Sequence, residues 1–283
     1  MIRWCICPDG ERIEKDLCLS PGGCRIGKRC ATLPYLRITL EDRNYKGISP
    51  SMAGNGARQI WLKATREYAV DPIQRVWAVL GTGTHSNLAR LEYGEGTLQE
   101  TEFDIGTADL LEPDEQNPGS YVLTDGKIWG SFKVAKSLGI KTVDVNTGEY
   151  FKTGAKAGQQ KTRKEIIYDP TIIDLRSEQY QLSSYAYKFQ DKGYPISRMQ
   201  LMIIVRDGGT AIAKGRGIDL SLYLLPLELI SRDEVYSYYG SLEETVLRAF
   251  KGEIPPMCSP YESWDGRRCS EQYCDVYNHC KEL

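Results

Sequence analysis

The chain lacks several features that would place it in a common class of protein. None of its apolar runs approaches the roughly 20 residues that a membrane span needs. Its start, from Met1 to Cys5, has no signal-peptide architecture. A formal net charge of -2 also lacks the basic excess typical of nucleic-acid-binding proteins, so any DNA contact must come from local patches. We therefore expect a cytoplasmic protein that makes no use of a membrane.

Cysteine is absent from the long stretch between Cys30 and Cys258 and concentrated at the two ends. The total of nine is odd, which in a protein expected to be cytoplasmic argues against disulfides and for metal ligation. The N-terminal five are Cys5, Cys7, Cys18, Cys24 and Cys30, and the C-terminal four are Cys258, Cys269, Cys274 and Cys280.

The N-terminal cysteines lie in a segment, residues 1–30, that is too small to bury a core of its own. A bound metal would supply the missing stability, and four thiolates suit zinc. One of the five would be spare, either Cys5 or Cys7. We assign the site to Cys7, Cys18, Cys24 and Cys30. The alternative is a set of reduced thiols in a loop.

The stretch from Gly106 to Lys127 carries the most chemistry. Asp109 follows a glycine turn, and the polar Pro/Gly segment 112–119 has the turn chemistry of a hairpin. That hairpin would bring Asp109 close to Asp125 and Lys127, which share a strand face because they are two residues apart. Two carboxylates and an ammonium suit a hard divalent cation and a group that orients water, as in a metal-dependent phosphodiesterase. The alternative is an ordinary salt bridge on an exposed hairpin.

Two helices are expected before this stretch. The spacing of apolar residues predicts one over 58–67, and Asp71-Pro72 provides the N-cap and first-turn proline of a second. On the second helix, His85 and Glu92 are seven residues apart and would share a face.

Residues 177–193 also have a helical pattern, with Gln181 and Tyr185 adjacent on one face. Near a metal, an amide and a phenol can hold a phosphate or order water, whereas ordinary helix packing is the alternative. The pattern then predicts an inner strand, a turn with a return strand, and an amphipathic helix, over 199–205, 206–218 and 226–250.

Four motifs, taken in chain order, resemble the RecB-like branch of the PD-(D/E)XK nuclease superfamily, which includes the CRISPR-associated iron–sulfur exonucleases and their phage relatives. They are Gly81-Thr-Gly-Thr-His85 with Leu91-Glu92, Gly106-x-x-Asp109, Asp125-x-Lys127 and Gln181-x-x-x-Tyr185. The resemblance implies that His85, Asp109, Asp125 and the carbonyl of Gly126 bind Mg²⁺ or Mn²⁺. It also implies that Lys127 positions the attacking water, with Gln181 and Tyr185 completing the catalytic group.

The sequence departs from the family pattern at two points. Gly126 stands where the family more often has an aromatic or aliphatic residue, which weakens the strand. The gap from Lys127 to Gln181 is long and indicates an insertion at about 140–170. Ile172–Arg176 is a rival to the Asp-x-Lys strand, but arginine stays protonated and is a poor fit there.

The insertion is basic, with no acidic residue from Phe151 to Lys164. A mobile basic loop beside a nuclease site would track a phosphate backbone, and a solvated loop is the alternative. Its basic residues are Lys152, Lys156, Lys161, Arg163 and Lys164.

The C-terminal cysteines, four within 23 residues, suit either zinc or a [4Fe–4S] cluster. The resemblance favours the cluster, as a staple that holds the C-terminus on the nuclease core. In the CRISPR-associated relatives one ligand is N-terminal and three come from the tail. Either Cys258 takes the place of that N-terminal ligand, or Cys30 reaches across.

We therefore expect an α/β protein with a restriction-endonuclease-like core, in which helices flank a mixed central sheet, and with Cys-rich metal-binding modules at both termini. The expected divisions are 1–47, 48–250 and 251–283. The expected function is metal-dependent hydrolysis of DNA, as an exonuclease on single strands or DNA ends, with a helicase, recombinase or CRISPR-type protein as partner. The alternative is a nucleic-acid-binding or complex-assembly subunit with a weak or idle nuclease site.

Overall fold

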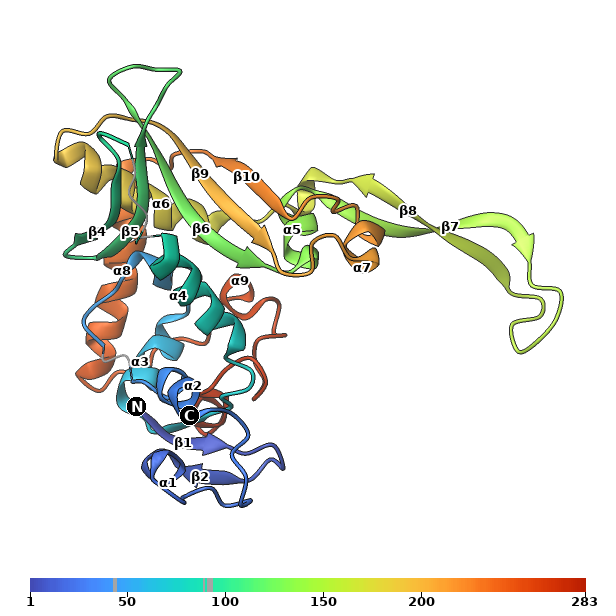
Figure 1. The fold of residues 1–283 in the computed structure, drawn as a ribbon, viewed down its shortest axis with the longest axis horizontal. Helices are drawn as coiled ribbons and strands as arrows, with labels where there is room; N and C mark the ends of the chain where they lie inside the picture. The colour runs from blue at the N-terminus through green and yellow to red at the C-terminus, as the bar shows by residue number, and fades with distance from the viewer. Residues whose placement is uncertain (43–44, 89, 91–93) are drawn as a thin grey trace.

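A five-stranded mixed sheet forms the centre of the computed structural model, which describes residues 1–42, 45–88, 90 and 94–283 (Figure 1). The strand order is β10-β9-β6-β5-β4, with β6 and β9 parallel and the other neighbours antiparallel. The strands are Leu98–Phe103 (β4), Gly106–Pro113 (β5), Tyr121–Trp129 (β6), Ile196–Val205 (β9) and Leu222–Leu227 (β10). Helices flank the sheet, so the expected mixed α/β architecture is confirmed.

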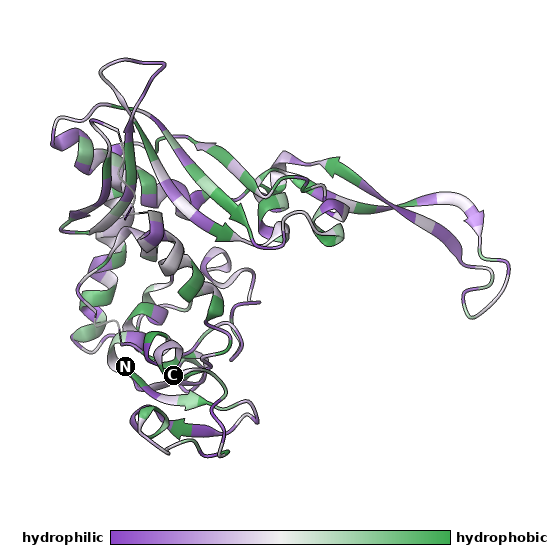
Figure 2. Cartoon of the chain, in the orientation of Figure 1, coloured by the Kyte–Doolittle hydropathy of each residue, from purple (hydrophilic) through white to green (hydrophobic). Residues whose placement is uncertain are grey.

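The core lies between this sheet and helix α6 (Arg176–Asp191). Strand β9 buries every second residue from Met199 to Val205, the period of a strand with one face in the core. Hydrophobic residues, green in Figure 2, are accordingly frequent along the strands of this sheet. Helix α6 contributes Leu182, Ala186 and Phe189 to the same cluster, so the face of α6 that carries Gln181 and Tyr185 is held close to β6.

The helical layer beside α6 is formed by α8 (Arg232–Phe250) and α3 (Ala57–Thr65). Ala57 and Ile60 of α3 pack against Leu242 and Val246 of α8. Helix α4 (Val76–Leu88) packs against β6 and brings the N-terminal half of the chain to the sheet. Two short 3-10 helices, η1 and η2, occupy Pro50–Met52 and Pro170–Ile172.

Three predicted elements differ from the structure. The second predicted helix begins at Val76, because the Asp71 side chain accepts the N–H of Ile73 and forms a turn there. The predicted return strand is replaced by α7 (Ala211–Gly215), which Thr210 caps, and the strand beside β9 is β10 instead. The predicted helix over 226–250 begins only at Arg232, after the Ser231 cap.

The N-terminal part forms a second sheet of order β2-β1-β3. Its strands are Ile2–Ile6 (β1), Arg12–Glu14 (β2) and Tyr68–Val70 (β3), with helices α1 (Lys15–Leu19) and α2 (Leu33–Thr39) beside them. Leu36 and Val70 complete its core, so the first 30 residues bury apolar surface only with help from α2 and β3. This sheet therefore extends past residue 47, where we placed the end of the N-terminal segment.

The insertion after α5 (Ser131–Ser137) is an antiparallel hairpin, where we expected a mobile loop. It consists of Ile140–Tyr150 (β7) and Gln160–Tyr168 (β8), and it projects from the end of the main sheet near α5 and α7 (Figure 1). Valine, isoleucine and threonine at many of its positions favour strands, which explains the regular pairing. We call residues 140–168 the arm.

The C-terminal tail carries α9 (Pro260–Ser263) and α10 (Tyr277–Lys281) and lies against α3 and the loop before it. Arg268 donates to the carbonyl of Gly54 and to the side chain of Asn55, and Arg58 donates to the carbonyl of Pro255. In the described part of the chain, no helix has the length and apolar character needed to cross a bilayer.

Candidate functional site

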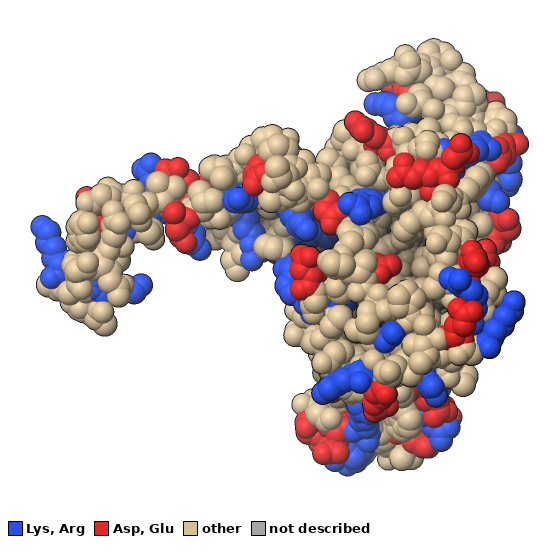
Figure 3. Space-filling model, turned by 180° about the vertical axis from the view of Figure 1, so that it is seen from behind, with Lys and Arg blue, Asp and Glu red and all other residues tan. Residues whose placement is uncertain are grey.

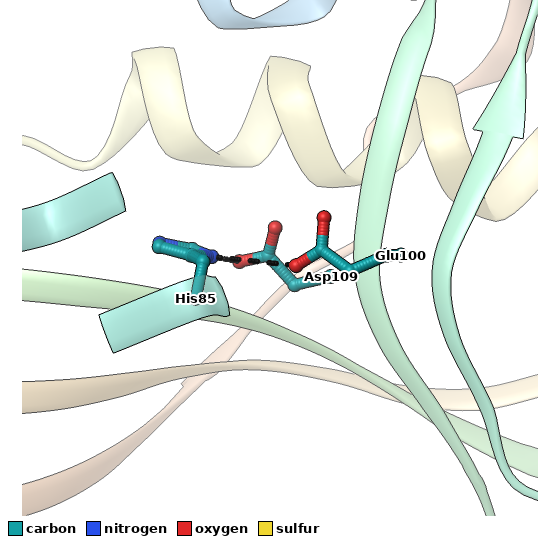
Figure 4. Close-up of side chains that lie close together, drawn as sticks. All are labelled: His85, Glu100 and Asp109. Carbon is teal, nitrogen blue, oxygen red and sulfur yellow. Dashed lines mark ion pairs between the residues drawn. The ribbon is translucent and has the colours of Figure 1, made fainter. Parts of the chain in front are cut away.

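Three potential metal ligands converge at the edge of the main sheet where α4 approaches it (Figure 4). His85 comes from α4, Glu100 from β4 and Asp109 from β5, and their ligand atoms all lie within 4.8 Å of one another. His85 Nδ1 is 3.2 Å from Asp109 Oδ2 and 3.9 Å from Glu100 Oε1. All three side chains are partly exposed, so an ion can reach them from solvent.

Glu100 was not expected from the sequence. Gln99 pairs with Leu110 and Thr101 with Ala108, so the register brings Glu100 to the level of Asp109. Glu100 itself has a φ of +41° and is not paired in the ladder. Two carboxylates facing each other across a strand pair repel, and burial and Asp109 together raise the pKa of Glu100. A cation between them would remove that repulsion.

The Asp109 carboxylate favours the charged form of His85, whereas it favours the neutral form of Glu100. Its interaction with the Asp109 carboxylate raises the pKa of the imidazole, although partial burial opposes the shift. A protonated imidazole beside two carboxylates neutralises the same negative charge that a divalent cation would neutralise, and His85 would have to lose this proton to act as a ligand.

Asp125 and Lys127 project from β6 toward α6, and Gln181 joins them into one network. Lys127 Nζ lies 2.6 Å from Asp125 Oδ2, and it donates to Gln181 Oε1 at 3.1 Å. Gln181 Nε2 donates in turn to Asp125 Oδ1 at 2.9 Å. The predicted proximity of Asp125 and Lys127 on one strand face is thus present, and Gln181 fixes the orientation of both.

Burial dominates the electrostatics of this network. Asp125 is only 4% exposed, and burial raises its pKa to about 6 although the Lys127 ammonium opposes the shift. Burial alone would lower the pKa of Lys127, but the Asp125 carboxylate outweighs it and the lysine pKa is raised. Lys127 is therefore protonated at neutral pH, and the proton that can move near neutrality belongs to Asp125.

Gly126 links the network to the ligand cluster. Its backbone N–H donates to Asp109 Oδ2 at 2.7 Å, which holds this carboxylate toward His85. A Cβ at position 126 would lie 3.4 Å from His85 Cε1 and 3.6 Å from Asp109 Oδ2. A methyl group fits there, but the aromatic or branched residue that the family pattern favours would fill the space next to the ligands.

Tyr185 lies beneath the site and not at its surface. The side chain is 4% exposed, its ring stacks on Phe103, and its hydroxyl lies so close to Gly106 that a Cβ there would be 2.8 Å away. Burial, with smaller contributions from Asp125 and Asp109, raises the pKa of this phenol. Gly106 also has a φ of +142°, so both its conformation and its contact with Tyr185 require glycine.

Glu92 and Asp174 are the two remaining residues considered from the sequence. Glu92, which we expected to share a helix face with His85, lies outside the described residues. The rival Asp174 follows η2 in an irregular segment and lies 3.9 Å from Lys136, so it is not part of a strand beside the ligand cluster.

The N-terminal cysteines gather around one small cavity. Cys7, Cys18, Cys24 and Cys30 all line it, together with Arg25 and Arg29. Cys5 is 2% exposed in the adjacent core, where burial and the neighbouring Cys18 raise its pKa. Cys5 does not line the cavity, so the four cysteines that we assigned to the site are the ones that surround it.

The C-terminal cysteines form a separate group beside α3. Burial raises the pKa of Cys258, and Glu262 and then Cys280, Cys269 and Cys274 reinforce the shift. Gly56 leaves room for this thiol, since a Cβ there would be 2.5 Å from Cys258 Sγ. Gln59 Nε2 lies 3.7 Å from Cys274 Sγ. Cys258 thus lies near the tail cysteines and Cys30 near the N-terminal set. Among the described residues, however, three ligand atoms come within 4.8 Å of one another at His85, Glu100 and Asp109 and not at either cysteine group.

Comparisons with protein-family models, with curated proteins and with solved structures found no match to the chain. The interpretation of the site therefore depends on its own geometry and chemistry.

Proposed function

We propose that this protein is a divalent-metal-dependent nuclease with a restriction-endonuclease-like core, which hydrolyses phosphodiester bonds in DNA as an exonuclease on single strands or at DNA ends. The observation that carries the proposal is the convergence of His85, Glu100 and Asp109 next to the Asp125–Lys127 pair. The order of elements also supports it, because a helix with the histidine precedes a three-strand meander with the carboxylates. Helix α6 and the parallel strand β9 then follow.

The donor set fits Mg²⁺ or Mn²⁺. Carboxylate oxygens and one imidazole nitrogen suit these ions, and the separation of 3.2 Å between His85 Nδ1 and Asp109 Oδ2 matches two neighbouring ligands of one ion. His85, Glu100 and Asp109 would hold the ion, with Asp125 beside them. When bound, a divalent ion supplies positive charge for the scissile phosphate and makes a water molecule more acidic.

Lys127 acts as a hydrogen-bond donor in this proposal. Its raised pKa keeps the ammonium charged at neutral pH, so it does not accept a proton from water. One of its hydrogens is donated to Gln181, Asp125 lies at ion-pair distance, and another hydrogen is available to a water or to a phosphate oxygen. The Gln181 bridge fixes the direction of this donor, and precise positioning of that kind lowers the cost of reaching the transition state.

Metal at the two cysteine groups belongs to the same proposal. Cys7, Cys18, Cys24 and Cys30 around one cavity suit zinc. Cys258, Cys269, Cys274 and Cys280 suit a [4Fe–4S] cluster or zinc, which would hold the tail on α3. Neither group borders the ligand cluster at His85, so their role is to stabilise the fold.

The test is a Mn²⁺-dependent cleavage assay on end-labelled single- and double-stranded DNA, with protein purified without oxygen. Asp109→Ala and Asp125→Ala should each reduce cleavage by at least about 100-fold, because a metal centre contributes several kcal/mol to such reactions. Asp174→Ala is the matched control, since it removes the carboxylate of the rival motif and should leave the rate unchanged. Full activity in Asp125→Ala would disprove the site. DNA binding without cleavage under any metal would favour a nucleic-acid-binding subunit.

A further inference from the structure

The arm is inserted between two parts of the chain that carry residues of the candidate site. It leaves the body after α5, which follows the strand with Asp125 and Lys127, and it returns before α6, which carries Gln181. Strand β7 has 11 residues, and a rise of about 3.4 Å per residue gives the arm a length of about 35 Å. Its root is therefore tied to the elements of the candidate site, whereas its tip lies far from the body (Figure 1).

The far end of the arm carries positive charge that the protein itself does not neutralise. Lys161 is paired with Glu149 and Arg163 with Glu165, at 2.9 and 2.5 Å. Lys152 and Lys156, near the tip, and Lys164, which lies midway along the arm opposite Asp144 in the ladder, are exposed. None of the ion pairs found among residues 1–42, 45–88, 90 and 94–283 includes them. Lys and Arg side chains gather at this end of the molecule in Figure 3.

The tip also presents aromatic surface. Lys156 and Lys161 lie over the ring of Phe151, at 5.8 and 5.9 Å from its centroid, and the neighbouring Tyr150 is 57% exposed. Unpaired lysines beside aromatic rings are the combination that binds a nucleic-acid strand, because the ammonium groups contact phosphates and the rings stack on bases.

We propose that the arm is a second nucleic-acid contact, which grips the phosphate backbone of the substrate about ten nucleotides from the bond that is cleaved. That number is the length of the arm alone divided by the rise of about 3.4 Å per nucleotide along the axis of a DNA duplex. The direction of the strand, from the ligand cluster toward the tip, rests on the proposed function. The binding of a strand by the tip does not. The inference therefore assigns the substrate class as strands that continue well past the scissile bond.

The experiment compares DNA strands of about 6 and about 24 nucleotides, shorter and longer than the reach of the arm. Affinity is measured by fluorescence anisotropy in EDTA, so that no cleavage occurs, over a range of salt concentrations. The full-length triple variant Lys152→Ala, Lys156→Ala, Lys164→Ala should bind the long strand about 100-fold more weakly at 0.1 M salt. Each lost phosphate contact lowers the slope of log affinity against log salt concentration by about 0.7. This corresponds to roughly a fivefold change in affinity per contact for each tenfold change in salt.

A matched variant removes the same charge elsewhere. Lys46→Ala, Lys251→Ala, Lys281→Ala replaces three exposed lysines outside the arm and should bind both strands as the unmodified protein does. Circular dichroism of both variants checks that they fold.

The outcomes separate the arm from the nuclease. An unchanged salt slope for the long strand in the arm variant would overturn the inference, and so would an equal loss for short and long strands. A change from dimer to monomer in sedimentation, with DNA binding intact, would show that the tip binds a second copy of the chain and would also overturn it. Normal arm-dependent binding without any cleavage would refute the proposed function and leave the arm as a DNA contact.

Discussion

Removing the charge of Lys127 should make the stability of the protein strongly dependent on pH. The change Lys127→Met keeps the length of the side chain but leaves Asp125, which is 4% exposed, without its cation. Breaking a buried ion pair in this way typically costs about 3–5 kcal/mol, because the remaining charge is buried alone. Asp125 can avoid that cost by taking up a proton, so its pKa should rise above the value of about 6 that it has beside Lys127.

The direction of this pH dependence follows from the linkage between protonation of Asp125 and folding. Burial raises the pKa of Asp125 from 3.8 to about 6, so its stabilising contribution is complete below 3.8 and is lost as the pH rises through 6. At about 1.4 kcal/mol per pKa unit, the unmodified protein loses about 3 kcal/mol by this route. In Lys127→Met the loss continues above pH 6, and it adds about 3 kcal/mol by about pH 8 if the new pKa reaches that value.

The assay is urea unfolding at several pH values in EDTA, followed by circular dichroism. The difference in unfolding free energy between Lys127→Met and the unmodified protein should grow steadily from about pH 6 to about pH 8. Lys188→Met is the control, because its partner Asp104 is 72% exposed and such pairs contribute at most about 1 kcal/mol. A deficit in Lys127→Met that is constant over this pH range would refute the reasoning, since Asp125 would then not be the group that titrates.

Two further changes test the metal sites. Glu100→Gln should weaken Mn²⁺ binding about 10- to 100-fold in isothermal titration, because it removes one of three convergent ligands. Glu102→Gln, on the same strand, is its control, and equal affinities in the two variants would remove Glu100 from the site. Cys269→Ser should lower the iron content and Cys24→Ser the zinc content, and each should lower the melting temperature, because both metals are proposed to stabilise the fold. Loss of all cysteine-bound metal from either single variant would contradict two separate sites.

The sequence was sufficient for the part of the site that depends on short-range structure. Asp109, Asp125 and Lys127 lie on β5 and β6, which a Pro/Gly turn connects, so the hairpin could be predicted from its turn. Glu100 was missed because β4, Leu-Gln-Glu-Thr-Glu-Phe, is largely polar and has no strong strand pattern. The signal was nevertheless present, since the short link from Phe103 to Gly106 makes a second hairpin whose register brings Glu100 to the level of Asp109.

Features that depend on long-range packing could not be predicted from the sequence. The burial of Cys5 against Leu36 and Val70, which come from α2 and β3, is one such feature. The position of Cys258 is decided by contact with Gly56, which lies about 200 residues earlier in the chain. Neither contact leaves a periodic pattern, because each joins segments that are distant along the chain.

The arm and the two cysteine-rich ends are attached to the core at points where they do not interrupt the pairing of the main sheet. The arm is inserted between α5 and α6, and the cysteine-rich ends lie against α3 and β3, so the pairing of β5, β6 and β9 does not depend on them. A long insertion between two elements costs little in loop entropy, since that cost grows only with the logarithm of loop length. Gln181 must nevertheless return to Asp125 after the arm, and the apolar face of α6 against β9 ensures that it does. The arm can therefore be altered without moving the ligand cluster, and this independence allows DNA binding by the arm and cleavage at the site to be tested separately.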